Sequence, residues 1–127
     1  MEKTDRRKYP RVEVHSSITY WCINKEGSLI IDQNMGVAKN ISQNGILLET
    51  GRELESAYIS LMFVDIEEKL AKIKGEIAYS KQNESGMFSN GIKFMGNHAQ
   101  NTQFARKLIR SCHYRKSDFV LVLCVNP

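Results

Sequence analysis

Alternating hydrophobic and polar residues predict strands along most of the chain. The clearest run spans residues 71–79, where one face consists of Ala71, Ile73, Gly75, Ile77 and Tyr79. The residues between them are mostly charged, and a period of two places one face in a core and the other in water. Residues 57–63 repeat this pattern. Residues 12–23 follow it with a slip near residues 15–18, so we expect an irregular first strand.

Three weaker runs complete the set of strands. Residues 29–39 are interrupted by Asp32, Gln33 and Asn34, residues 46–50 form a short apolar run, and residues 89–95 carry a further strand pattern. Turn-forming residues separate these segments. Six or seven strands joined mostly by short polar turns favour an antiparallel barrel or sandwich.

The period changes after Gly96. Phe104, Ala105, Leu108, Ile109 and Cys112 form an apolar stripe at helical spacing, which predicts an amphipathic helix over residues 99–113 that packs on the strands. This helix accounts for the basic residues of the segment without a ligand. Residues 119–125 are a continuous apolar run, too short to cross a bilayer. We expect them to form a terminal strand that completes the sheet or pairs with a second copy in a homodimer.

The composition agrees with one soluble globular domain. The chain has 127 residues, of which 42% are hydrophobic and 25% charged. No segment approaches the roughly 20 apolar residues of a membrane span, and the polar N-terminus lacks the apolar core of a secretory signal. We therefore expect a cytoplasmic protein without membrane insertion.

The cysteines and histidines do not indicate a catalytic or metal-binding site. Three cysteines (Cys22, Cys112 and Cys124) lack the spacing of a zinc site, so we interpret them as small buried hydrophobes. Three histidines (His15, His98 and His113) are scattered, with no nucleophile or carboxylate pair at catalytic spacing. The sequence therefore predicts neither an enzyme nor a metal site.

Positive charge is concentrated at the N-terminus. The net charge is only +4, yet Lys3, Arg6, Arg7, Lys8 and Arg11 lie within the first eleven residues. Pro10 biases this segment away from helix. Two guanidinium groups four residues apart on an extended arm can reach one compact anion, and their planar fork suits phosphate and the O6/N7 edge of guanine.

A polar loop is predicted at residues 40–45, with the sequence Asn-Ile-Ser-Gln-Asn-Gly between two strands. Asn40 and Ser42 offer short donors and acceptors. Gly45 can adopt a positive φ and let the backbone turn sharply into the next strand. Taken alone, such a loop is an ordinary turn. It indicates a binding site only in combination with the arginine arm.

The two segments together resemble the PilZ domain, a cyclic di-GMP-binding family. Arg7 to Arg11 matches its Arg-x-x-x-Arg motif, and Asn40 to Gly45 matches its (Asp/Asn)-x-Ser-x-x-Gly motif. The segment Gly91-Ile92-Lys93-Phe94 resembles the glycine-aromatic strand near the end of the family. The resemblance covers residues 6–115. It implies an all-β, six-stranded antiparallel barrel of PilZ type with a C-terminal helix.

This resemblance divides the chain into a mobile arm over residues 1–11, a barrel with its closing helix over residues 12–115, and an apolar tail over residues 116–127. It implies that Arg7 and Arg11 hold phosphate and guanine, that Asn40 and Ser42 contact guanine, and that Gly45 shapes the loop. Further contacts are implied for Arg6 and Gly91. The family often has Asp where this chain has Asn40, and a neutral amide gives a weaker bond to guanine than a carboxylate.

The resulting hypothesis is a cyclic di-GMP receptor that uses no cofactor. Ligand would order the arm, and the changed surface would signal to a downstream protein. Two alternatives stay open. A small-barrel nucleic-acid binder would use basic residues near Tyr9, Tyr20 and Trp21, but the small charge excess argues against DNA or RNA. The second alternative is a PilZ-like protein-interaction module that has lost ligand binding.

Overall fold

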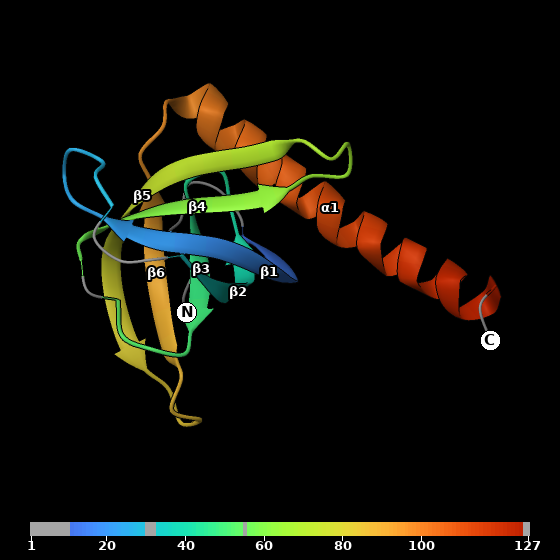
Figure 1. Cartoon of the computed structure of the whole chain (residues 1–127), viewed down its shortest axis with the longest axis horizontal. Helices are drawn as coiled ribbons and strands as arrows, with labels where there is room; N and C mark the ends of the chain where they lie inside the picture. The colour runs from blue at the N-terminus through green and yellow to red at the C-terminus, as the bar shows by residue number, and fades with distance from the viewer. Residues whose placement is uncertain (1–10, 30–32, 55, 126–127) are drawn as a thin grey trace, which may run out of the picture.

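The computed structural model describes residues 11–29, 33–54 and 56–125, with side chains described as far as Cys112. These residues form six strands and one helix (Figure 1). The elements are β1 (Val12–Ile23), β2 (Asn34–Ile41), β3 (Gly45–Thr50), β4 (Tyr58–Val64), β5 (Leu70–Gln82), β6 (Phe88–Phe94) and α1 (His98–Val125).

The strands close into one antiparallel barrel in the order β1-β2-β3-β6-β5-β4, with β4 pairing back onto β1. This confirms the predicted six-stranded barrel with a C-terminal helix. The predicted slip in the first strand is also present, because the pairing of β1 with β2 shifts register between Glu13 and Ser16. A closed barrel leaves no unpaired sheet edge within the described strands.

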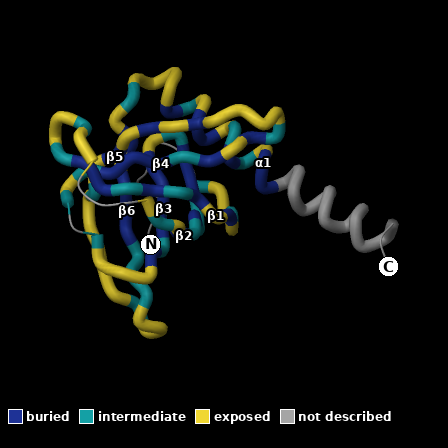
Figure 2. The backbone as a smooth tube through the Cα atoms, in the orientation of Figure 1, coloured by how far each residue is buried: buried dark blue, intermediate teal, exposed yellow. Residues whose placement is uncertain are grey.

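Apolar side chains fill the barrel. Figure 2 marks the buried residues along the backbone of the strands and of α1. The core includes the fully buried Ile18, Leu48 and Leu61, which come from three different strands. Phe104 of α1 lies at 5.2 Å from the ring of Phe63 and at 5.4 Å from that of Phe94, both edge to face. Edge-to-face aromatic pairs are favourable beyond the area they bury, so α1 covers the barrel by inserting an aromatic side chain.

The helix begins where the sequence places it. The Gln100 backbone N–H donates to Asn97 Oδ1 and the Asn97 N–H donates to Gln100 Oε1, both at 2.8 Å. This reciprocal pair is a capping box that satisfies backbone donors left unpaired at a helix start. The apolar stripe is oriented as predicted, with Phe104, Ala105 and Leu108 in the core.

The C-terminal end differs from the prediction. Residues 119–125 were expected to form a strand, but α1 continues through them to Val125. Two physical reasons account for this. The closed barrel offers no edge to a seventh strand, and each residue added to an existing helix gains a hydrogen bond without a new nucleation cost.

One residue of β5 leaves its predicted face. The alternation placed Tyr79 inside with Ile73 and Ile77, yet Tyr79 is 55% exposed. The cause is a register shift between Ile77 and Tyr79, which inserts Ala78 as an extra residue opposite β6. A bulge of this kind reverses the direction of the residues that follow it.

The remaining expectations about composition can be placed on the described residues. Cys22 and Cys112 are buried free thiols, as predicted, whereas the side chain of Cys124 lies outside the described set. His15 and His98 are exposed. Within the described part of the chain, no helix is long and apolar enough to span a bilayer. No cluster of three potential metal ligands occurs there either.

Candidate anion-binding site

Strand pairing brings the two sequence motifs together. Arg11 immediately precedes β1, and the antiparallel pairing of β1 with β2 sets Glu13 opposite Asn40. Arg11 Nη1 consequently donates a hydrogen bond of 2.8 Å to Asn40 Oδ1, across 29 residues of sequence. The end of the first motif and the start of the second therefore lie in direct contact.

The loop between β2 and β3 is shorter than predicted, because Asn40 and Ile41 belong to β2. Only Ser42, Gln43 and Asn44 lie between the strands. The Ser42 backbone N–H donates to the Gly45 carbonyl at 2.9 Å. The Asn44 N–H donates to Ser42 Oγ at 3.1 Å. Ser42 is buried, so its hydroxyl shapes the tight turn by accepting a local backbone bond.

Gly45 is needed for a different reason than the one predicted. Only Gly27 and Gly86 among the described glycines have positive φ, so Gly45 does not use the left-handed conformation that glycine permits. Instead, β3 approaches β6 so closely here that a Cβ on Gly45 would lie well under 3.0 Å from the Ile92 carbonyl oxygen. The missing side chain permits the close approach of two backbones.

A surface hollow of about 220 Å³ lies beside this approach. Its lining comprises Arg11, Asn44, Gly45, Ala78, Tyr79, Gly91, Ile92 and Lys93. Three sequence-predicted residues thus meet in one place, namely Arg11, Gly45 and Gly91. Ser42 does not join them, since it lines a separate hollow of about 230 Å³ against α1, with Thr102 and Ile109.

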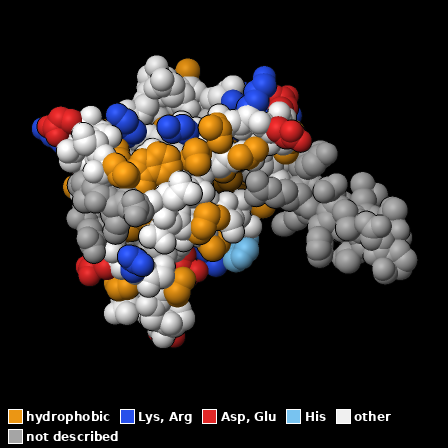
Figure 3. All heavy atoms as spheres, viewed as in Figure 1, with side chains coloured by type: hydrophobic (Ala, Val, Ile, Leu, Met, Phe, Trp, Pro, Cys, Tyr) orange, Lys and Arg blue, Asp and Glu red, His pale blue; other side chains and the backbone are white. Residues whose placement is uncertain are grey.

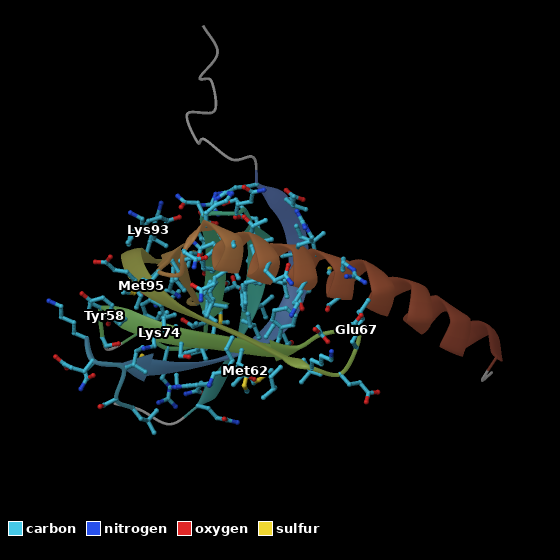
Figure 4. The ribbon with its side chains drawn as sticks, turned by 90° about the horizontal axis from the view of Figure 1, so that it is seen from above. Tyr58, Met62, Glu67, Lys74, Lys93 and Met95 are labelled. Atoms are coloured by element: carbon cyan, nitrogen blue, oxygen red, sulfur yellow. The ribbon has the colours of Figure 1, made fainter. Side chains whose placement is uncertain are left out.

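Two lining residues were missed by the sequence reasoning. Lys93 lies opposite Gly45 across the β3–β6 pair and is an outward-pointing side chain in Figure 4. The alternation of β6 could have revealed it, because residues 91 and 93 share one face of a strand. Tyr79 could not have been found this way, since its position depends on the bulge.

The charges at the hollow favour an anion. Arg11 and Lys93 are cationic, and none of the described lining residues is acidic. Glu76 lies opposite Lys93 across the β5–β6 pair. Asn40, which holds Arg11, is neutral. The guanidinium of Arg11 adds its positive charge to that of Lys93, and arginine is the side chain best suited to bind phosphate.

A larger hollow lies elsewhere on the described surface. It measures about 500 Å³ and is lined by residues of β1, β4 and β5 together with the start of α1. Lys72 Nζ lies 5.4 Å from the ring centre of Trp21 there. Figure 3 shows hydrophobic side chains gathered over β4 and β1 on this side of the molecule. None of the described motif residues lines this hollow, so it is distinct from the candidate anion site.

The predicted ligand contacts Arg6 and Arg7 lie outside the described residues. Arg11 is the described end of that arm.

Comparison with known proteins identifies the family. A model of the PilZ domain matches residues 5–113. The chain belongs to the PilZ domain family. PilZ domains are a family of cyclic di-GMP receptors, and the residues matched include both motifs described above.

Solved structures agree on the PilZ fold. Bacillus subtilis MotI/DgrA, an inhibitor of motility, superposes with a TM-score of 0.60 at 14% identity, covering 92% of this chain and 54% of that one. The PilZ domain of YcgR from Escherichia coli with c-di-GMP gives 0.59 at 8% identity, over 91% and 98% of the two chains. The K. pneumonia MrkH–c-di-GMP complex gives 0.55 at 17% identity, over 98% and 57%.

The present PilZ chain spans about half the length of MotI/DgrA and MrkH. No curated protein matches it.

Proposed function

We propose that this PilZ chain is a cyclic di-GMP receptor that passes the presence of its ligand to a partner protein. The observation that carries the proposal is the 2.8 Å hydrogen bond between Arg11 and Asn40, which assembles the two family motifs. The structures of MrkH and of the YcgR domain were both obtained with c-di-GMP, which supports the same ligand class for this fold.

The arginines are proposed to hold the phosphates. Cyclic di-GMP carries two phosphodiester groups, each singly negative, and a guanidinium can donate two parallel hydrogen bonds to one of them. Arg11 has five N–H donors, so it can keep its bond to Asn40 while it binds an anion. Arg7, four residues earlier, would supply the second guanidinium, and Arg6 an additional contact.

Asn40 is proposed to orient Arg11 without neutralising it. An aspartate at this position would form an ion pair with the guanidinium and cancel much of its charge. The amide oxygen of Asn40 instead accepts a single bond and leaves the net charge of the pair at +1. The weaker bond that a neutral amide makes to guanine is thus offset by a stronger attraction for phosphate. Ser42 and Gly45 contribute by fixing the tight turn that follows Asn40 and Ile41.

The response to ligand is proposed to be a change of surface, with no chemical step. Arg11 connects the arm to β1, and a ligand that binds Arg7 and Arg11 together would hold the arm against the barrel beside Gly91. A ligand shifts such an equilibrium only through its different affinity for the two arrangements. The surface formed by arm and ligand would then be the one that a downstream protein recognises.

Calorimetric titration with cyclic di-GMP tests this proposal. The wild type should bind, and Arg11→Ala and Arg7→Ala should each weaken binding by about 10- to 100-fold, the range expected for one charge-assisted contact. Arg52→Ala is the matched control, because it removes the same charge from an exposed position outside the lining of the hollow. Absence of binding by the wild type at tens of micromolar ligand would refute the proposal, and so would equal affinity of the Arg11 and Arg52 variants.

A further inference from the structure

The hollow of about 500 Å³ lies over a row of side chains that crosses three strands. Trp21 of β1 lies opposite Ser60 of β4, and Ser60 lies opposite Lys74 of β5. Ser60 alternates along β4 with Ile59 and Leu61, which belong to the core, so the row faces outward. Serine is the smallest of the three side chains. The hollow therefore follows from a small residue placed between two large ones.

Two lysines are held at fixed positions in this hollow. Lys72 Nζ lies 5.4 Å from the centre of the Trp21 ring. A Cβ built at Gly27, in the turn after β1, would lie 2.9 Å from Lys74 Nζ, so this ammonium group lies over the turn. Neither lysine forms an ion pair with a described residue. Among the described residues that line the hollow, these two carry the only charges.

The uncharged part of the lining is largely apolar. It includes Trp21, the buried Ile23 and Ile73, and Met95, which is 49% exposed. Tryptophan is among the side chains that most often dominate protein–protein binding energy, and methionine adapts to partners of different shape. Figure 3 shows further hydrophobic side chains over β4 and β1, with basic side chains along one edge, and Figure 4 places Met62 on β4. The lining thus combines an apolar anchor point with two free cations.

We propose that this hollow docks an acidic segment of a partner protein. The segment inserts a large apolar side chain beside Trp21, above Ser60, and sets its carboxylates on the ammonium groups of Lys72 and Lys74. Complementary charges of this kind select the correct partner and suppress wrong ones. The inference rests on the proposed function in one respect, because it assigns the acidic segment to the downstream protein.

This docking does not require the ligand. The hollow shares no lining residue with the candidate anion site, and it is complete without cyclic di-GMP. The acidic segment should therefore bind with equal affinity in the presence and absence of ligand. The surface formed by arm and ligand would supply a second contact with the same partner. Two linked contacts raise the overall affinity without any change in the first one.

The surrounding charges favour a peptide over an extended polyanion. Glu26 lies in the turn after β1, while Glu67 and Glu68 lie in the turn between β4 and β5, and all three are exposed. Figure 3 shows acidic side chains at both ends of this face. A bilayer or a nucleic acid would meet these carboxylates together with the lysines. Clusters of roughly four to eight basic residues are typical of lipid binding, whereas a short acidic segment fits between the two turns.

Selection of short peptides from a random library displayed on phage, with the full wild-type chain as bait, tests the proposal. The selected peptides should be enriched in Asp and Glu around a large apolar residue. Fluorescence anisotropy with synthetic copies should show binding to Lys72→Glu/Lys74→Glu at least about tenfold weaker, since repulsion replaces attraction at two positions. The matched control is Lys81→Glu/Arg110→Glu, which makes the same change of net charge at exposed positions outside the lining. It should bind like the wild type.

Two further measurements separate docking from loss of folding. Ser60→Leu fills the hollow without a change of charge and should weaken binding to a similar extent, with a thermal melt of each peptide-free variant as the check on folding. Peptides in which lysine replaces each glutamate should bind Lys72→Glu/Lys74→Glu more tightly than they bind the wild type. A variant that had merely lost its fold would not show this reversal of preference.

Three results would overturn the proposal. The first is the recovery of no peptide, or of peptides without an acidic bias. The second is equal affinity of the two charge-reversed variants, and the third is a selected peptide that binds only when cyclic di-GMP is present. Binding of phosphatidylglycerol vesicles or of an oligothymidine that Lys72→Glu/Lys74→Glu abolishes, in place of peptide binding, would assign the hollow to that other class of partner.

The docking surface and the receptor function fail separately. If the wild type binds acidic peptides through the hollow and does not bind cyclic di-GMP, the docking surface stands and the receptor function is refuted. If it binds cyclic di-GMP and no acidic peptide, the docking surface is refuted and the receptor function stands.

Discussion

The role assigned to Gly45 predicts a loss of stability on Gly45→Ala. The substitution introduces one methyl group at a position where φ is not left-handed, so backbone strain of the usual glycine kind is absent. The methyl group would instead lie well under 3.0 Å from the Ile92 carbonyl oxygen and near the Lys93 Cα. These are backbone atoms of a paired strand, and no side-chain rotation can relieve the overlap.

The structure allows an estimate of the cost. Overpacking of one methyl group against a fixed neighbour typically costs about 1–3 kcal/mol. If β3 moves away from β6, the Phe94 N–H to Asn44 carbonyl bond of 3.0 Å is strained as well, at about 1 kcal/mol for a net hydrogen bond. The expected loss is about 2–4 kcal/mol of unfolding free energy. A urea slope of about 1–3 kcal/mol/M converts this to a midpoint lower by about 1–3 M.

Urea denaturation followed by the fluorescence of the single tryptophan, Trp21, measures this change. Gly51→Ala is the matched control, because a Cβ at Gly51 meets nothing within 4 Å. It should leave the midpoint unchanged or raise it slightly, since alanine restricts the unfolded chain. Equal midpoints for the two variants would show that the close approach of β3 and β6 is not what requires the glycine.

Two other predictions concern stability away from the site. Leu108 is fully buried in the core, so Leu108→Ala should lower the unfolding free energy by about 2–5 kcal/mol. A urea midpoint like that of the wild type would contradict the packing of α1. The Lys69 N–H bond, with a smaller contribution from Glu67, lowers the pKa of Asp65. A carboxyl group whose pKa is lower in the folded state stabilises the fold at pH values above its unfolded-state pKa. This stabilisation is lost as the pH falls through the folded-state pKa. The thermal midpoint should therefore fall more steeply below about pH 4 for the wild type than for Asp65→Asn.

Much of the fold could be predicted from the sequence because alternation depends only on which side of a strand faces the core. The long run in β5 and the apolar stripe of α1 are correct on this basis, apart from Tyr79. The exception is instructive. A one-residue bulge at Ala78 depends on how β5 pairs with β6, and pairing is a tertiary property that no local pattern contains. The prediction of a terminal strand was wrong for the same reason, since only the closed barrel shows that no sheet edge is available for pairing.

The arrangement of the candidate site could be predicted in part, while its ligand contacts stay predictions. The resemblance implied roles for Arg11, Asn40 and Gly91, and the structure brings Arg11 into contact with Asn40 and into one hollow with Gly91. The resemblance could not show that Ser42 is buried in a turn, nor that Gly45 permits the close packing of two strands. Residue type indicates which chemistry a side chain can perform, whereas burial and partners decide whether that chemistry is available to a ligand.

The distance in sequence between the two motifs is a consequence of strand pairing. Arg11 reaches Asn40 because β1 and β2 are antiparallel and Glu13 lies opposite Asn40, so the residues that join these strands do not determine the contact. The register shift between Glu13 and Ser16 determines this contact, because it fixes which residue of β2 lies opposite the start of β1. The same holds on the other side of the hollow, where a second bulge decides that Tyr79 meets Gly91. Two local irregularities in a regular barrel thus place an arginine and an aromatic ring at one surface hollow. A bulge that weakens a barrel and serves no function is expected to be rare. These two bulges are explained if the hollow that they create binds a nucleotide.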